Sequence, residues 1–301
     1  LGTYPYYLLQ SYESSDGNWW TANAELQWDI FVNNRITTGI EYQDNIRADY
    51  KTWNIDTSNQ PIFLFNQNFP FTLFSYFLQN EFQAMSNLSL TVGLRQDFYS
   101  TVGNAFSPRF AIVYNPWKAS TLKLLYGESF RAPNINEVDY ESKTSSPIAI
   151  GNPSLKPEKI ATREVVFEQR ISEEIYAVGS LYDYQMKNLI DQIEDTVNNT
   201  VQFQNVSTVR AHGIEVGFQA KFTNGIHGYL NYGQQDAEDK GTSLDLTNSP
   251  EHLWKTGFSY PFSQSFWAST ELRYESRRIT LLRTYTSDFL DRKSTRLNSS
   301  H

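Results

Sequence analysis

Apolar and polar side chains alternate along most of this chain. In TANAELQWDI, residues 21–30, every second residue is apolar, and the alternation recurs in NLSLTVGLRQDF at 87–98, GIEVGFQAKF at 213–222 and SFWASTELRYE at 265–275. A period of two puts all the apolar side chains on one face of an extended strand. The pattern predicts about thirteen strands between Trp19 and Glu275, each with one apolar and one polar face.

The predicted connections alternate in length. Short turns are expected at 33–34, 86–87, 115–117, 172–173, 223–225 and 261–263, and long polar connections at 43–70, 100–107, 128–158, 187–199 and 234–250. Successive antiparallel strands reverse direction, so the long connections all emerge from one edge of the sheet. This arrangement, with strands near the roughly 9–11 residues that cross a bilayer at a tilt, is typical of an all-β transmembrane antiparallel barrel. A soluble sandwich has strands of about 5–6 residues and covers its apolar face with a second sheet.

Composition supports this fold class and excludes others. Aromatic residues make up 15% of the chain and fit the interfacial girdles of a membrane barrel. We expect Tyr42, Trp117, Tyr126, Trp254 and Tyr260, near strand ends, to belong to these girdles. The net charge of -8 argues against a nucleic-acid partner, and the absence of cysteine excludes disulfides and thiolate metal sites.

Charged and metal-ligating residues give no sign of catalysis. His212, His227 and His252 fall on separate predicted strands, so each is expected in a wall or an interface rather than at a metal ion. Charges on the polar face, such as Arg95 and Glu215, are expected to line the barrel interior. No two of these charges are close enough in the sequence to nominate an acid–base couple. We therefore predict that the chain is no enzyme and needs no metal or cofactor.

Four segments, in order, resemble one protein family. FRAPN at 130–134 with GNPSLKPE at 151–158 is similar to the paired box in the barrels of TonB-dependent outer-membrane receptors. FLQNEFQAMSNLSLTVGLRQD at 77–97, NVSTVRAHGIEVGF at 205–218 and NSPEHLWKTGFSY at 248–260 resemble further strands of that family. Each segment alone is a weak signal, but the four in order cover about two thirds of the chain.

The resemblance implies a barrel of about 22 strands in the bacterial outer membrane, closed by an N-terminal plug domain. It also implies that TonB, with ExbB and ExbD, grips the plug and relays the proton gradient to admit a scarce solute. No plug and no TonB box are found in this chain, and LGTYPYYLLQ at its start has no features of a signal peptide. We expect residues 1–291 to be part of the receptor barrel. RKSTRLNSSH, residues 292–301, is expected to be a non-native tail derived from a sequencing adapter.

The paired box provides the first group of candidate site residues. Its members are Phe130, Arg131, Ala132, Pro133, Asn152, Pro153, Pro157 and Glu158. The box recurs across receptors for different substrates, so a structural role at strand ends is the first interpretation, and direct ligand contact, above all by Arg131, is the second. The haem receptors of the family carry a histidine between the two halves, and NINEVDYESKTSSPIAI at 134–150 has none, which counts against haem.

Aromatic residues of the long connections provide the second group. Trp53, Phe63, Phe65 and Tyr140 offer rigid apolar faces where a siderophore or a corrinoid would first land. The alternative is that Trp53 belongs to a girdle and that Phe63 and Phe65 form a small hairpin.

These expectations converge on a receptor that binds outer-membrane lipid with its wall and takes up a ferric siderophore through TonB. Cobalamin or another scarce nutrient is the alternative within the same family. A passive porin or an outer-membrane barrel enzyme forms a second class, and a soluble carbohydrate-binding β-protein forms a third.

Overall fold

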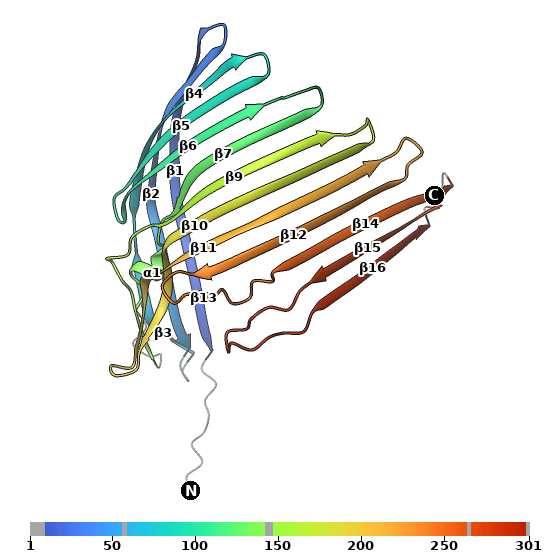
Figure 1. Cartoon of the computed structure of the whole chain (residues 1–301). Coiled ribbons are helices and arrows are strands. Elements are labelled where there is room, and N and C mark those ends of the chain that lie inside the picture. The colour runs from blue at the N-terminus through green and yellow to red at the C-terminus, as the bar shows by residue number, and fades with distance from the viewer. Residues whose placement is uncertain (1–9, 56–58, 142–146, 264–265, 299–301) are drawn as a thin grey trace.

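The chain forms one antiparallel sheet that is almost entirely strand. The computed structural model describes residues 10–55, 59–141, 147–263 and 266–298 (Figure 1). Its strands are β1 (Ser11–Phe31), β2 (Asn34–Ile55), β3 (Pro61–Asn68), β4 (Phe71–Met85), β5 (Leu88–Tyr99), β6 (Gly103–Tyr114), β7 (Ser120–Arg131), β8 (Ile148–Ile150), β9 (Glu158–Arg170), β10 (Ile175–Asp195), β11 (Thr200–Lys221), β12 (His227–Asp239), β13 (Leu244–Asp245), β14 (His252–Ser263), β15 (Phe266–Glu275) and β16 (Phe289–Asn298). A single short helix, α1 (Ile135–Val138), is found among the described residues.

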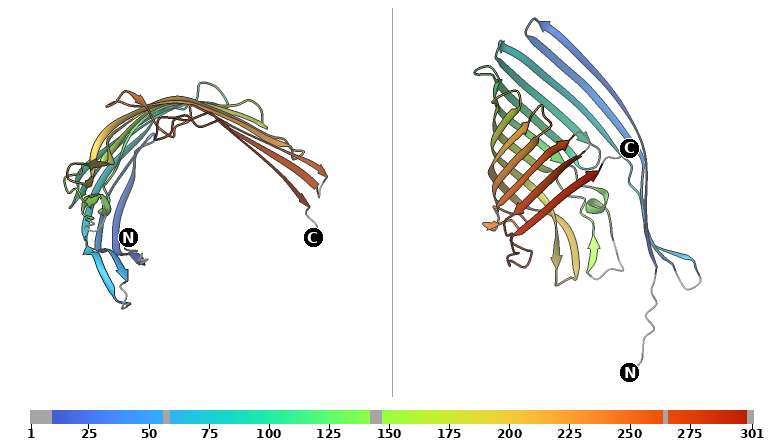
Figure 2. Two further views of the ribbon diagram at one scale, coloured as in Figure 1. Left: turned by 90° about the horizontal axis from the view of Figure 1, so that it is seen from below. Right: turned by 90° about the vertical axis from the view of Figure 1, so that its right-hand side faces the viewer.

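Strand order in the sheet follows chain order. Thirteen of the described strands pair successively with their antiparallel neighbours from β1 to β16, while β3, β8 and β13 attach to β2, β11 and β12. Figure 2 shows the sheet curved like a section of a barrel wall, with β1 and β16 at its two open edges. The predicted all-β antiparallel barrel architecture is confirmed, and within the described residues the wall does not close on itself.

The face that carries the alternating apolar residues has no second layer. Side chains such as Leu78, Val92 and Phe258 are about half exposed on this outward face. Their neighbours on the opposite face are polar and buried, as Ser75 and Asp97 show. An apolar sheet face of this extent is stable only in an apolar solvent, so the outward face fits lipid, and the soluble sandwich is ruled out.

Four of the five predicted girdle residues are exposed toward the two ends of this apolar face, and the fifth, Tyr126 of β7, is half-buried. Tyr42 and Trp254 are exposed in the half of the wall nearer the long connections. Trp117 and Tyr260 are exposed close to the short turns. Among the described helices, only the four-residue α1 occurs, and it is too short to cross a bilayer.

One predicted long connection is wrong. Only residues 100–102 form a tight turn between β5 and β6, and β6 begins at Gly103, which has a φ of 86°. Pro108 is accommodated within β6, because the β6–β7 ladder begins only at Arg109 and the missing N–H of Pro108 breaks no bond on that side. Ala105 and Ser107 point inward and are buried, whereas Phe106 is exposed, as strand alternation requires.

Other predicted long connections are largely extended hairpins. β1, β2, β10 and β11 are 21 or 22 residues long, about twice the length that a bilayer requires. They therefore continue past the outward apolar band into the aqueous space, which covers much of the predicted loops 43–70 and 187–199. The predicted strand length holds better for β5, β6, β7 and β14, with 12 residues each, and β15, with 10.

The segment predicted to be a non-native tail begins within the last strand. β16 continues the sheet through Asn298 and pairs with β15, with Arg292 opposite Leu272. The foreign origin of this tail stays a prediction.

Glycines of the inner face allow close approach between strands. Gly213 of β11 lies opposite Tyr182 of β10. A Cβ at Gly213 would lie 2.3 Å from the carbonyl oxygen of Gln234 and 2.6 Å from the Tyr182 hydroxyl oxygen. At Gly127 of β7, by contrast, a Cβ would meet nothing within 4 Å.

We predict that Gly213→Ala lowers the free energy of unfolding by about 1–3 kcal/mol, because the backbone of β12 has to shift to admit the methyl group. Gly127→Ala is the matched control and is expected to change stability by less than about 1 kcal/mol. Denaturant unfolding of the protein in detergent, followed by tryptophan fluorescence, measures both. Equal stability of the two variants would contradict the packing described for Gly213.

Candidate functional site at the outer rim

The long connections meet at one edge of the wall, here called the outer rim. The largest of them, residues 132–157 between β7 and β9, contains α1 and β8. β8 pairs in parallel with the start of β11, with Ile148 opposite Thr200. The connection therefore extends past β9 and pairs with the β10–β11 hairpin, which is distant from it in the sequence.

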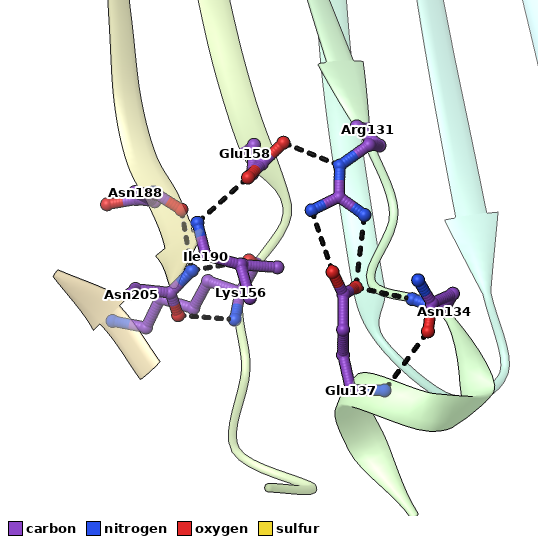
Figure 3. Close-up of polar contacts among 8 residues, drawn as sticks. All are labelled: Arg131, Asn134, Glu137, Lys156, Glu158, Asn188, Ile190 and Asn205. Carbon is purple, nitrogen blue, oxygen red and sulfur yellow. Dashed lines mark hydrogen bonds and ion pairs between the residues drawn. The ribbon is translucent and has the colours of Figure 1, made fainter. Parts of the chain in front are cut away.

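Arg131, the last residue of β7, is the centre of this fastening (Figure 3). Its Nε–H donates to Glu158 Oε2 at 2.6 Å. Its two terminal nitrogens donate to the two carboxylate oxygens of Glu137, each at 3.0 Å. The guanidinium group thus makes two hydrogen bonds to one carboxylate and one to another. Such charge-assisted bonds are strong and fix the orientation of the group.

The sequence places Glu137 for this contact through a capping box. The Asn134 side chain accepts a hydrogen bond from the backbone N–H of Glu137 at 3.0 Å, and Glu137 Oε2 accepts from the Asn134 N–H at 2.8 Å. This reciprocal pair satisfies backbone donors at the start of α1. Glu137 is 7% exposed, so its charge depends on Arg131 for compensation.

The second half of the box is held by the β10–β11 hairpin. Asn205 accepts from the Lys156 N–H and donates to the Lys156 carbonyl, both at 2.9 Å, and also donates to the Asn188 carbonyl at 2.7 Å. Asn152 donates to the Phe203 carbonyl at 2.8 Å. We call Arg131, Glu137 and Glu158 with these asparagine contacts the rim clasp.

The 132–157 connection is closely packed where the rim clasp holds it. Leu155 is 4% exposed, and Pro157 is buried. A Cβ at Gly151 would lie 2.5 Å from the Val138 carbonyl oxygen, so only glycine lets the two halves pass so closely.

Electrostatics reinforce the clasp outside the membrane-spanning part of the wall. Burial by itself would raise the pKa of Glu158, but hydrogen bonds from Arg131 and from the Ile190 N–H, at 2.8 Å, hold that pKa below its usual value. Hydrogen bonds to Glu158 and Glu137 raise the pKa of Arg131 further above its already high value. Both groups are therefore charged at neutral pH.

The aromatic candidates form two groups at the same rim. Phe65 of β3 contacts Tyr140 of the 132–157 connection, with ring centroids 5.1 Å apart in an edge-to-face arrangement. Tyr50 of β2 joins them at 5.6 Å from Tyr140 and 5.9 Å from Phe65, and Phe69 stacks on Phe65 at 6.0 Å. We call these four residues the aromatic cluster.

The second group comes from β1, β2 and β3 alone. Trp53 stacks on Tyr12, with centroids 5.6 Å apart, and meets Phe63 at 5.9 Å. Phe63 lies opposite Trp53 in the β2–β3 hairpin, and β3 also carries Phe65, so the small hairpin considered as an alternative is present. The structure thus brings Phe65 and Tyr140 together but keeps Trp53 and Phe63 in a separate group.

Tyr50 was missed in the sequence, although it joins the two loops. Its hydroxyl donates to Glu13 Oε1 at 2.8 Å. Burial, together with this hydrogen bond, raises the pKa of Tyr50 to about 12, so the hydroxyl remains a donor at neutral pH.

Several residues of the paired box make contacts within the fold. Phe130 meets Tyr99 edge to face at 6.0 Å, and the Pro157 carbonyl accepts from Asn188 at 3.5 Å. Ala132, Pro133 and Pro153 have no such polar contact among the described residues. Each of the three guanidinium nitrogens of Arg131 donates to a carboxylate, which supports the structural interpretation of the box, and direct ligand contact by Arg131 stays a prediction.

The described part of the chain offers no metal centre. It contains no group of three or more His, Asp or Glu side chains placed to hold an ion. His212, His227 and His252 lie on β11, β12 and β14, as the separate-strand prediction required.

A single-layer antiparallel wall with an apolar outward face and long connections fastened at one rim defines a transmembrane β-barrel protein of the outer membrane. The chain matches, over residues 2–298, the family model described as TonB dependent receptor-like, beta-barrel. It belongs to this family of outer-membrane transport receptors, which are not enzymes.

Curated relatives and solved structures agree with this assignment. The chain is 31% identical over 182 residues to the vitamin B12 transporter BtuB of Vibrio cholerae serotype O1, covering 60% of this chain and 27% of that protein. It is 22% identical over 227 residues to the iron-regulated outer membrane virulence protein of the same organism, covering 69% and 34%.

The fold is shared with siderophore receptors and a copper transporter. The siderophore receptor PirA from Acinetobacter baumannii has a TM-score of 0.73 at 15% identity, covering 93% of this chain and 48% of that one. The copper transporter OprC has a TM-score of 0.73 at 14% identity, covering 94% and 48%. The chain therefore spans about a quarter to a third of these curated relatives and just under half of these solved chains.

We predict that Arg131→Ala loosens the 132–157 connection, because Glu137 loses the partner of its buried carboxylate. In Arg131→Ala, backbone amides of this connection should exchange with deuterium at least about tenfold faster than in the unaltered protein. Exchange in Arg131→Lys should be intermediate between the unaltered protein and Arg131→Ala, because lysine keeps the charge but not the two-pronged geometry. Arg35→Ala, which breaks an exposed ion pair with Asp29 at 2.8 Å, is the control and should leave the connection unchanged. Unaltered exchange in Arg131→Ala would show that the clasp does not hold the loop.

The lowered pKa of Glu158 gives the clasp a pH dependence. A carboxyl group whose pKa is lowered by folding stabilises the fold fully above its ordinary value of 4.5, and this contribution is lost as pH falls through the lower folded value. We expect amide protection around Ile190, corrected for intrinsic exchange, to fall as pH is lowered below about 4.5. Glu158→Gln should weaken this protection at neutral pH and flatten its pH dependence; an unchanged profile would contradict the assignment.

Proposed function

We propose that this chain is the barrel portion of a receptor that takes up a ferric siderophore across the outer membrane. In this proposal, TonB with ExbB and ExbD energises uptake through a plug domain of the kind that the family resemblance implies. The observation that carries the proposal is the aromatic cluster at the outer rim, where side chains from two separate connections meet.

The aromatic cluster suits a large ligand with flat apolar surfaces. Phe65 and Tyr140 provide ring faces at fixed angles, and the Tyr50 hydroxyl oxygen, whose proton is donated to Glu13, can accept a hydrogen bond. Arg47 and Lys51 lie on the other face of β2, within ion-pair distance of Asp49, so the cluster offers ring faces rather than charge to a ligand. Ring faces of this kind suit the aromatic or broad apolar surface of an iron chelate.

The rim clasp supports the proposal in a second way. Tyr140 follows α1 directly, and α1 is held by the bonds from Arg131 to Glu137. The clasp thereby keeps one wall of the aromatic cluster in position, which lowers the entropy cost of ligand binding. In this arrangement Arg131 acts through the structural interpretation of the box, because it positions a contact residue; direct contact of Arg131 with the ligand stays a separate prediction.

Relatives are compatible with either ligand, so cobalamin stays the second candidate. The iron-regulated outer membrane protein is similar over 69% of this chain at 22% identity, and the vitamin B12 transporter over 60% of it at 31% identity. A corrinoid also presents a broad apolar face, so the same aromatic residues would serve either ligand. A passive porin would need no such preorganised rim.

We predict that the full-length receptor, expressed in a bacterium without its own siderophore and vitamin B12 receptors, restores uptake of radiolabelled iron from a ferric siderophore and that deletion of TonB abolishes it. Uptake of labelled cobalamin alone would select the second candidate. Uptake of either ligand without TonB would contradict active transport and favour the porin.

Within this assay, Tyr140→Ala should weaken uptake at low ligand concentration about tenfold, because one face of the aromatic cluster is lost. Phe258→Ala, which removes an exposed ring from the lipid-facing side, is the matched control and should leave uptake unchanged. Equal uptake by both variants would move the ligand site away from the aromatic cluster.

A further inference from the structure

A second site lies at the outer rim, far along the wall from the aromatic cluster. A pocket of about 520 Å³ is enclosed by the connection between β12 and β14 and the connection between β15 and β16. The two connections are tied to each other: Asn248 N–H donates to the Ile279 carbonyl at 2.7 Å, and Arg283 donates to the Asp245 carbonyl at 2.7 Å. The volume is within the range of small-molecule sites, about 300–1,000 Å³.

Strand register gives the height of this pocket relative to the membrane. Tyr232, Trp254 and Tyr274 lie opposite one another on β12, β14 and β15, on the outward face. The Tyr232 and Trp254 rings touch, with centroids 4.4 Å apart, and form part of the outer girdle. Pocket residues His252 and Asp236 lie two and four positions further toward the rim, roughly 7 and 14 Å along the tilted strands from the girdle. The pocket is therefore at and just above the level of the lipid headgroups.

One wall of the pocket offers guanidinium groups for an anion. Arg277 lies over the Tyr285 ring, 4.6 Å from its centroid, and its side chain makes no ion pair with any residue that the structure describes. The neighbouring Arg278 has a single carboxylate near it, Glu275, at 3.9 Å. Both side chains thus retain unused donors, which is the arrangement that binds phosphate oxygens.

The other wall offers acceptors for hydroxyl groups. The carboxylates of Asp236 and Asp245 line the pocket and form no hydrogen bond or ion pair with the described part of the chain. Two more carboxylates line the pocket and already have partners: Asp288 accepts from the Arg277 N–H at 2.7 Å and from the Tyr274 hydroxyl at 3.2 Å, and Glu251 Oε1 lies 3.6 Å from His252 Nε2. A ligand that complements both walls carries a negative group at one end and hydroxyl donors at the other.

We propose that this pocket binds the phosphorylated sugar headgroup of an outer-leaflet glycolipid. Arg277 and Arg278 hold the phosphate, and Asp236 and Asp245 accept bonds from sugar hydroxyls. The Tyr285 ring keeps Arg277 oriented and presents an edge to the sugar. The acyl chains descend past the exposed Trp254 onto the apolar face of the wall. The proposal does not depend on which nutrient the receptor carries.

The test is a binding titration of the full-length receptor, purified in detergent and freed of lipid, with deep-rough lipopolysaccharide, counted by native mass spectrometry. We expect Arg277→Ala/Arg278→Ala to weaken binding at least tenfold. Arg163→Ala is the matched control, because Arg163 is on the lipid-facing side of β9 and already pairs with Asp183 at 3.0 Å; its binding should be unchanged. Dephosphorylated glycolipid should bind the unaltered receptor as weakly as native glycolipid binds the double variant.

Three results would overturn the proposal. The double variant could bind the glycolipid as tightly as the unaltered receptor does. Arg163→Ala could lose as much affinity as the double variant. Phosphatidylglycerol could bind as tightly as the glycolipid, which would show that binding depends on negative charge alone. Heat-modifiable migration on a gel confirms that each variant is folded. If the double variant is not, Tyr285→Ala takes its place, with an expected loss of several-fold because Arg277 is no longer oriented.

Discussion

The hydrogen-bond ladder between successive antiparallel strands is the interaction on which this structure depends. In lipid, no solvent satisfies a backbone N–H or carbonyl group, so each strand of the wall needs a partner on both sides. Because the backbone groups are used in the ladder, successive side chains point alternately toward lipid and toward the polar interior. Val92 and Leu94 point toward lipid, and Asp97 and Ser75 point toward the interior. A wall of this kind is thin, and its inner face is polar because the interior is not a hydrophobic core. Buried charges there are met by partners, as Arg95 shows by bridging Glu41 and Asp97 at 3.0 and 2.8 Å.

The outer rim is stabilised differently from the wall, since water surrounds both faces of the strand extensions. The wall fixes where the long connections begin, but it supplies few contacts above the apolar band. The rim clasp provides them with charge-assisted bonds between β7, α1 and β9 and with asparagine side chains from β10 and β11. Such bonds hold segments that have little apolar area to bury. They also let a polar mouth stay ordered while its surface remains open to a ligand.

The sequence predicts the wall better than the rim. Alternation identifies the spans because one face of each strand is apolar, and the turn at 86–87 was placed to the residue. The alternation fades where both faces are wet, so the extensions of β2, β10 and β11 read as loops. At Pro108 a residue that usually ends a strand is tolerated because its neighbour β7 has already left the ladder. The spacing of Asn134 and Glu137 is a local capping-box signal that the sequence analysis did not use, whereas Asn205 as the partner of Lys156 depends on a register that connects residues far apart in the chain.

Because strand order equals chain order, each strand of the wall meets a partner that was made just before it or just after it. Forming the wall hairpin by hairpin closes only short loops, so the chain entropy lost at each step is small even though the finished sheet is large. Sequence distance between partners, rather than the size of the sheet, governs how fast such contacts form. The wall can therefore grow as a zipper, whereas the clasp, which joins residues 156 and 205, has to wait until the strands between them have been laid down.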